Sequence, residues 1–163
     1  MKVLVAFDSQ YGNTEKIARA IAEAFTPPNE VEIKRIPEVD PGTLSGFDLL
    51  IAGSPTQRLR PTEATSEWIK NIPANGLRNI SVAAFDTRLT DEEIEKVRIF
   101  KFFVGIFGFA ADPIAKELKK KGGTLVVPPE GFYVTGTEGP LVEGELERAQ
   151  DWSKSISRPD MPS

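Results

Sequence analysis

The chain has 163 residues, of which 40% are hydrophobic and 27% are charged, and its formal net charge at pH 7 is −4. This composition fits a single domain with a substantial core, and it offers no basic stripe for a nucleic-acid partner. The sequence contains neither cysteine nor histidine, which excludes disulfides, thiolate nucleophiles, cysteine-bound iron–sulfur clusters and a Ser-His-Asp triad.

The first predicted elements are a strand and a helix joined by a polar loop. Residues 3–7 form an apolar run with the length and β-branched content of a strand buried on both faces. After the loop DSQYGNT at residues 8–14, the apolar side chains of Ile17, Ile21 and Phe25 recur at helical spacing. This order brings main-chain N–H groups and the positive end of a helix to one point, where a phosphate could bind.

The polar loop carries neither Lys nor Arg. A phosphate there would be stabilised by main-chain dipoles and by the side chains of Ser9, Asn13 and Thr14. The absence of GxGxxG and GxxxxGK(S/T) argues against dinucleotide and P-loop nucleotide sites. In the alternative interpretation, Asn13 or Thr14 is an ordinary N-cap and Gly12 is a turn residue.

The rest of the chain alternates between strand-like and helix-like segments. Further strands are predicted at residues 31–36, 47–52, 80–85 and 124–127. Helices are predicted at residues 62–72, 91–121 and 143–156. The second of these helices is predicted to break at Asp112-Pro113, with Asp112 capping its second part, and to end at Gly122-Gly123.

Five strands with intervening helices predict an α/β fold, a doubly wound parallel sheet in three layers. We expect one domain over residues 1–156 and a flexible C-terminal tail at residues 157–163. Ligands of such sheets bind at the carboxyl ends of the strands, near the point where the strand order switches. Three polar loops leave strands there, with the sequences DSQYGNT, GSPTQRLRPT and DTRLT.

In these loops the chain resembles the flavodoxin-like FMN-binding family. The phosphate loop of that family runs Ser/Thr-x-x-Gly-x-Thr, which Ser9, Gly12 and Thr14 satisfy. The segment GSPT at residues 53–56 is similar to the second flavin loop, and FDTR at residues 85–88 lies where the third one falls. The ending GTEGPLVEGELERAQDW also resembles that of small family members. The resemblance implies a five-stranded sheet of order 2-1-3-4-5.

The cofactor that the resemblance implies is FMN. Its phosphate would be held by the first loop, through Ser9, Gln10, Tyr11, Gly12, Asn13 and Thr14. Its isoalloxazine ring would be bordered by the other two loops, through Pro55, Thr56, Gln57, Arg58, Asp86, Thr87 and Arg88. Because these two loops hold no Trp or Tyr, we expect weaker binding than in a flavodoxin with an aromatic sandwich.

The second and third loops add positive charge near the expected ring. Arg58, Arg60 and Arg88 would favour an anionic reduced flavin and so raise the reduction potential. In the alternative interpretation these arginines are solvated or pair with Asp86 and Glu63.

The stretch IFKFFVGIFGF at residues 99–109 is apolar on nearly every face. We expect it to pack into the core as a helix, and the alternatives are the interface of a homodimer or an apolar wall over the flavin. The longest apolar run is too short to span a bilayer, and the amino terminus enters a strand without a signal segment. We therefore expect a cytoplasmic protein with no membrane span.

The leading functional prediction is an FMN-binding electron-transfer protein in which no side chain is catalytic and no metal is bound. Its partner would be a redox protein or a small-molecule electron acceptor. One alternative is an FMN-dependent NAD(P)H oxidoreductase that acts on quinone-like acceptors. The other is a binding or scaffold domain with this fold and no flavin.

Overall fold

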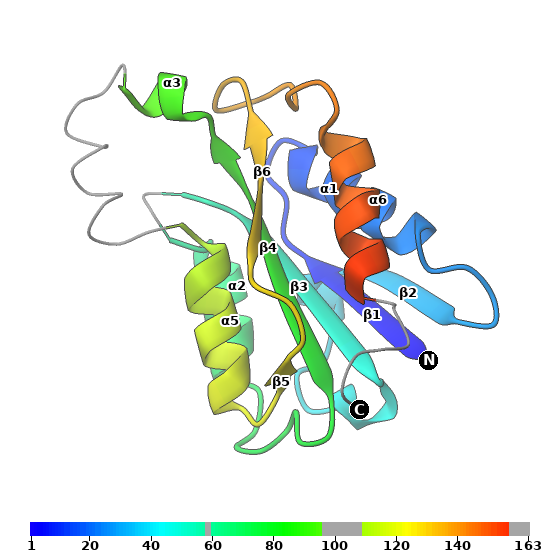
Figure 1. The fold of residues 1–163 in the computed structure, drawn as a ribbon. Coiled ribbons are helices and arrows are strands. Elements are labelled where there is room, and N and C mark those ends of the chain that lie inside the picture. Colours follow the sequence, from blue (N-terminus) through cyan, green and yellow to red (C-terminus); the bar gives the residue numbers. More distant parts are fainter. Residues whose placement is uncertain (58–59, 96–108, 157–163) are drawn as a thin grey trace.

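The computed structural model describes residues 1–57, 60–95 and 109–156, which fold into a parallel sheet between two layers of helices (Figure 1). The strands are β1 (Lys2–Phe7), β2 (Glu30–Arg35), β3 (Leu49–Pro55), β4 (Ser81–Leu89), β5 (Thr124–Leu125) and β6 (Glu130–Val134). The helices are α1 (Asn13–Glu23), α2 (Glu63–Lys70), α3 (Asp91–Glu95), α5 (Ala111–Lys120) and α6 (Glu145–Ile156), with 3₁₀ turns η1 (Ile36–Glu38) and η2 (Leu44–Gly46). The strand order β2-β1-β3-β4-β5 confirms the predicted topology. The predicted tail lies outside the described residues.

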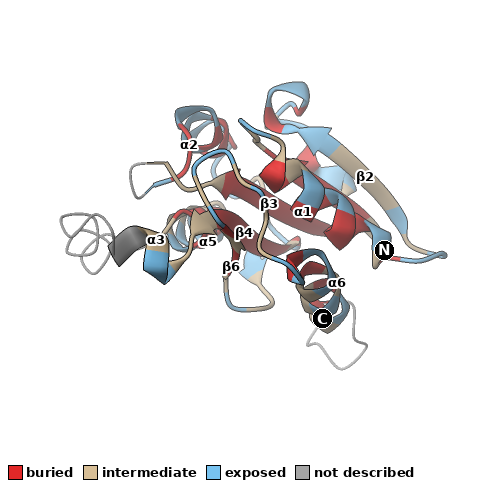
Figure 2. Ribbon diagram, turned by 90° about the horizontal axis from the view of Figure 1, so that it is seen from above, coloured by how far each residue is buried: buried red, intermediate tan, exposed pale blue. Residues whose placement is uncertain are grey.

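The two helical layers bury opposite faces of the sheet. On one face α1 and α6 cover Val5, Ile51 and Phe85, and on the other α2 and α5 cover Leu50 and Val82. Side chains alternate between the faces along each strand, so a central strand covered on both sides must be apolar at every position. Figure 2 shows this burial in β3 and β4, while β2 at the edge stays partly exposed.

The fifth strand, predicted at residues 124–127, is found as the shorter β5, and β6 is an additional strand that also pairs with β4. Val82 pairs with Leu125, whereas Phe85 pairs with Glu130. From the first of these pairs to the second, the chain after β5 advances five residues while β4 advances three. The N–H of Val126 still donates to the carbonyl of Val82 (3.1 Å), so the extra residues leave the ladder at positions 127–129. Two of those residues are prolines, which have no N–H to donate. The predicted strand ends early for this reason, and the sequence analysis missed β6.

The strands β3 and β4 continue past the apolar runs from which they were predicted. The ladder between them extends to the pairs Ser54–Asp86 and Pro55–Thr87. Apolar runs indicate where burial ends, whereas main-chain pairing can continue through polar residues. The residues predicted for the third loop thus lie on the end of a strand, where their side chains alternate between the two faces.

The long helix predicted at residues 91–121 is found as α3 and α5, and residues 96–108 lie outside the described part of the chain. The N-cap of α5 is Ala110, so the prediction that Asp112 caps this helix is wrong. The first N–H of α5, from Ala111, is instead accepted by the distant carboxylate of Asp86 (2.8 Å). The helix ends as predicted, with Gly122 at a φ of +101°. Within the described ranges, no helix combines the length and apolar character that a membrane crossing requires.

The helix α6 is attached to β6 by a buried carboxylate. Glu145 accepts hydrogen bonds from the N–H of Tyr133 (2.8 Å) and from Nε of Arg148 (2.8 Å). Burial alone would raise the pKa of Glu145, but the hydrogen bonds from Arg148 and Tyr133 outweigh it and lower the pKa below its ordinary value.

The lowered pKa of Glu145 predicts a loss of stability in acid. A carboxyl group with a lowered folded-state pKa stabilises the fold fully above its ordinary pKa of 4.5, and this contribution decreases as the pH falls further. We expect Glu145→Gln to lower the free energy of unfolding at pH 7 by about 1.5–3 kcal/mol, as for a lost hydrogen bond to a charged group. Urea unfolding measures the free energy of unfolding of the native protein and of the variant. The difference between these two values should be smaller at pH 3.5 than at pH 7. A constant difference would contradict this role.

Candidate functional site

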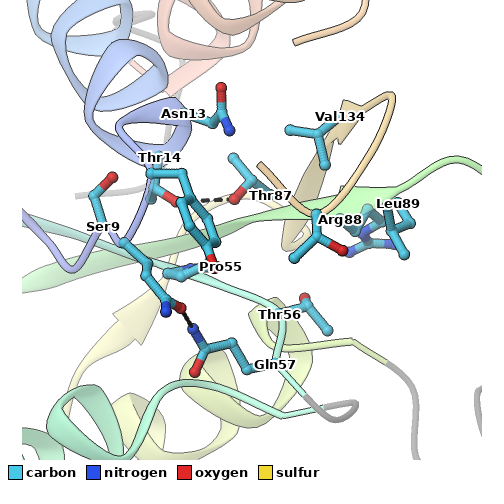
Figure 3. A pocket seen from close by; sticks show the side chains of 13 residues that line it. Ser9, Asn13, Thr14, Pro55, Thr56, Gln57, Thr87, Arg88, Leu89 and Val134 are labelled. Atoms are coloured by element: carbon cyan, nitrogen blue, oxygen red, sulfur yellow. Dashed lines mark hydrogen bonds between the residues drawn. The ribbon is translucent and has the colours of Figure 1, made fainter. Parts of the chain in front are cut away.

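A pocket of ≈ 110 Å³ opens at the carboxyl ends of β1, β3 and β4, where the three polar segments meet (Figure 3). It is lined by Ser9, Gln10, Tyr11, Asn13, Thr14, Pro55, Thr56, Gln57, Thr87, Arg88, Leu89, Val134 and Thr137. All the predicted site residues line it except Gly12, Arg58 and Asp86. Gly12 lies within the first loop, and Arg58 lies outside the described residues. The structure therefore brings together the three segments that the sequence singled out.

The first loop turns at Gly12, whose φ of +93° lies in the left-handed region that favours glycine. Gly12 is also the N-cap of α1 and provides no side-chain cap, so neither Asn13 nor Thr14 is the N-cap. Inside the loop, Ser9 Oγ accepts hydrogen bonds from the N–H of Gly12 (3.1 Å) and of Glu15 (3.4 Å). Within the described ranges, the N–H groups of Asn13 and Thr14 have no protein acceptor.

These free donors fit a phosphate group. Both N–H groups belong to the first turn of α1, where the helix dipole adds positive potential. A phosphate ester accepts several hydrogen bonds at once, and a helix N-terminus supplies them without a cationic side chain. The phosphate of FMN therefore matches the donor set of this loop.

The three segments are joined by hydrogen bonds at the floor of the pocket. The hydroxyl groups of Thr14 and Thr87 are 2.8 Å apart and buried, as the dashed line between them in Figure 3 shows. The N–H of Thr56 donates to the carbonyl of Thr87 (2.9 Å), and the hydroxyl of Thr56 accepts from the N–H of Ala110 (3.2 Å). The third segment is thus bonded to both of the others.

Gln57 and Arg60 of the second loop are paired through their main chains beside the pocket. The main chains of Gln57 and Arg60 exchange two hydrogen bonds, of 2.9 and 3.0 Å. The side-chain amide of Gln57 donates to that of Gln10, so the first and second loops meet at the rim (Figure 3). Arg60 is exposed to solvent.

Asp86 lies beneath the pocket, and its side chain is fully buried. Its carboxylate accepts hydrogen bonds from Nε and Nη2 of Arg88, both at 2.7 Å, in addition to the N–H of Ala111. Burial raises the pKa of Asp86, although the hydrogen bonds and the charge of Arg88 oppose this. The guanidinium of Arg88 also stacks on the ring of Phe109, with its central carbon 3.8 Å from the ring centre.

This ion pair decides between the two interpretations of Arg88. Along a strand, alternate side chains point to the same face, so Asp86 and Arg88 share one side of β4 while Thr87 faces the first loop. The interpretation in which Arg88 pairs with Asp86 is the one that the structure shows. The charge of Arg88 is thus balanced by a carboxylate in direct contact, and the predicted effect of this arginine on the flavin potential loses its basis.

The end of β6 and the segment after it form a further side of the pocket that the sequence analysis missed. Val134 and Thr137 line the pocket together with Leu89. The side-chain amide of Asn13 donates to the carbonyl of Glu138 (3.1 Å), which holds this segment against the first loop. The resemblance of the chain ending to family members was a signal for this side of the pocket, but it assigned no residue to the site.

The match to known proteins covers most of the chain. The family model described as Flavodoxin matches residues 5–152. A flavodoxin of Picosynechococcus sp. is 42% identical over 67 residues, which span 41% of this chain and 38% of that protein. A flavodoxin of Maridesulfovibrio salexigens is 27% identical over 130 residues, which span 77% of this chain and 81% of that protein.

Solved structures share the fold at lower identity. Oxidised Flavodoxin 1 from Bacillus cereus is 17% identical, with a TM-score of 0.74 and coverage of 96% of this chain and 97% of that one. Rubredoxin oxygen:oxidoreductase from Desulfovibrio gigas is 20% identical, with a TM-score of 0.70. That match covers 95% of this chain but 35% of the other, so the same fold also occurs as part of a larger protein.

Proposed function

The chain belongs to the flavodoxin family, and on this premise we propose that its first loop holds the phosphate of FMN while the isoalloxazine ring lies between the second and third segments. The observation that carries this placement is the pair of N–H groups, from Asn13 and Thr14, that have no acceptor in the described part of the chain. Flavodoxins bind FMN and transfer electrons, so the bound flavin supplies the redox chemistry at its ring. The polypeptide chain binds the flavin and orients its ring.

The ring would lie against apolar side chains. Leu89 and Val134 line the pocket on the side of β4 and β6, and Pro55 lines it on the side of β3. Among the described lining residues the aromatic side chain is that of Tyr11, which is 48% exposed. We infer that aliphatic contacts replace one face of an aromatic sandwich, which agrees with the weaker flavin binding expected from the sequence.

Flavin titration tests the placement of the phosphate. We expect FMN to bind at least about 100-fold more tightly than riboflavin, because two charge-assisted hydrogen bonds together contribute about 3 kcal/mol. The quenching of flavin fluorescence on titration with protein gives both dissociation constants. Equal affinities for FMN and riboflavin would contradict the proposed phosphate site. Uptake of neither flavin would favour the scaffold domain without flavin.

The lining residues favour an electron carrier over an NAD(P)H oxidoreductase. A nicotinamide dinucleotide is anionic, and Arg88, the arginine among the described lining residues, already forms an ion pair with Asp86. We expect the FMN-loaded protein to oxidise NADH and NADPH hardly at all in the presence of a quinone, as measured by the decrease in nicotinamide absorbance. Rapid turnover would instead support the oxidoreductase.

The partner of this carrier is a redox protein or a small electron acceptor. The cytoplasmic location expected from the sequence stays a prediction. The core packing expected for residues 99–109, and the homodimer given as an alternative to it, also stay predictions because most of this stretch lies outside the described residues. Sedimentation of the FMN-loaded protein would measure its oligomeric state.

A further inference from the structure

Arg35 lies next to the first loop, although it comes from a different strand. It is the last residue of β2, and it pairs in register with Phe7, the last residue of β1. Its guanidinium carbon lies 5.4 Å from the centre of the Phe7 ring. The side chain, 45% exposed, reaches past the end of β1 to the loop that follows.

The guanidinium of Arg35 joins the two ends of this loop. Its Nη1 donates to the main-chain carbonyl of Ser9 (3.3 Å), and its Nη2 donates to Oε1 of Glu15 (2.9 Å). Ser9 lies near the start of the loop, and Glu15 lies in the first turn of α1. The planar fork of one arginine thus connects the residues before and after the turn at Gly12.

The contact with the carbonyl of Ser9 also sets the direction of the next N–H group. In a trans peptide the C=O and the N–H point to opposite sides of the chain. The bond between Ser9 and Gln10 is trans, since the cis peptides of the described residues lie elsewhere. With the carbonyl held by Arg35, the N–H of Gln10 must therefore point away from Arg35. Within the described ranges, this N–H has no protein acceptor.

The charge of Arg35 is largely balanced by Glu15, with which it forms an ion pair. Its main effect on the loop is therefore geometric. We propose that Arg35 is a positioning residue for the phosphate of the flavin, which keeps the peptide between Ser9 and Gln10 turned so that its N–H can donate to the phosphate. This inference rests on the proposed placement of FMN in the first loop.

The test compares Arg35→Gln with a matched control, Arg19→Gln. Arg19 pairs with the same carboxylate of Glu15 (3.7 Å), one turn further along α1, and its side chain is 58% exposed. We expect Arg35→Gln to weaken FMN binding about tenfold, as for one lost hydrogen bond to a charged group. Riboflavin binding should stay unchanged because riboflavin lacks the phosphate. Arg19→Gln should change neither affinity.

Two results would overturn the role of Arg35. One is an Arg35→Gln variant whose FMN affinity equals that of Arg19→Gln. The other is an equal loss of FMN and riboflavin affinity, which indicates a general effect on the fold. If the native protein itself does not prefer FMN to riboflavin, the proposed phosphate site fails. If the native protein prefers FMN and Arg35→Gln keeps the full preference, only the role of Arg35 fails.

Discussion

Replacement of Asp86 by Asn is expected to lower the free energy of unfolding by about 3–5 kcal/mol, the usual cost of breaking a buried ion pair. Three donors point at this carboxylate, namely two nitrogens of Arg88 and the N–H of Ala111. The amide of Asn presents a donor of its own at one of the two positions where the carboxylate accepts. At least one buried donor would therefore lose its partner. Urea unfolding at pH 7 measures the loss.

A double variant distinguishes the contribution of the paired charges from that of the side-chain volume. Replacing a buried ion pair by apolar side chains of similar size is often neutral, so Asp86→Leu combined with Arg88→Met should recover the part of the lost stability that comes from unpaired charge. The N–H of Ala111 still loses its acceptor in this double variant, so the recovery is incomplete. If Asp86→Asn lowered the free energy of unfolding by less than about 1 kcal/mol, this account would be contradicted. The buried ion pair would then contribute no more than an exposed one.

The second large effect is expected from Ser9→Asp, which places a negative charge inside the first loop. The hydroxyl of Ser9 accepts from the N–H of Gly12, and a carboxylate at this position can accept the same bond, so the turn should persist. At about 5 Å and an effective dielectric of about 20, the repulsion is about 3 kcal/mol for each negative charge of the phosphate. We expect FMN affinity to fall by at least about 100-fold. Fluorescence titration measures the change.

The neutral variant Ser9→Asn is the control for this experiment. It has nearly the same shape as Ser9→Asp and should lose far less FMN affinity, whereas riboflavin should bind similarly to both variants. If Ser9→Asp bound FMN as tightly as Ser9→Asn does, the phosphate would lie elsewhere. The comparison therefore tests the position of the phosphate independently of Arg35.

Local patterns in the sequence were sufficient to predict the fold and the position of the turn in the first loop. The apolar run before Ser9 and the helical spacing after Thr14 depend on neighbouring residues, and so does the need for glycine at position 12. Local chemistry of this kind can be predicted without tertiary structure because the interacting groups are close together in the chain. Errors arose where a ladder continued through polar residues, as in β4, or where prolines interrupted it, as between β5 and β6.

The amino-acid sequence by itself determined the layered parallel sheet, the order of its elements and the polar first loop with its turn at Gly12, because periodicity and turn chemistry act over a few residues. Only the tertiary structure decided that Asp86 and Arg88 neutralise each other beneath the pocket, that Val134 and Thr137 complete its wall, and that Arg35 reaches the first loop. The contacts of Val134, Thr137 and Arg35 join segments that are far apart in the chain, and they depend on strand register. Asp86 and Arg88 are neighbours on one face of β4, and their pairing depends on which face the fold buries. Neither property is set by the residues next to them in the chain.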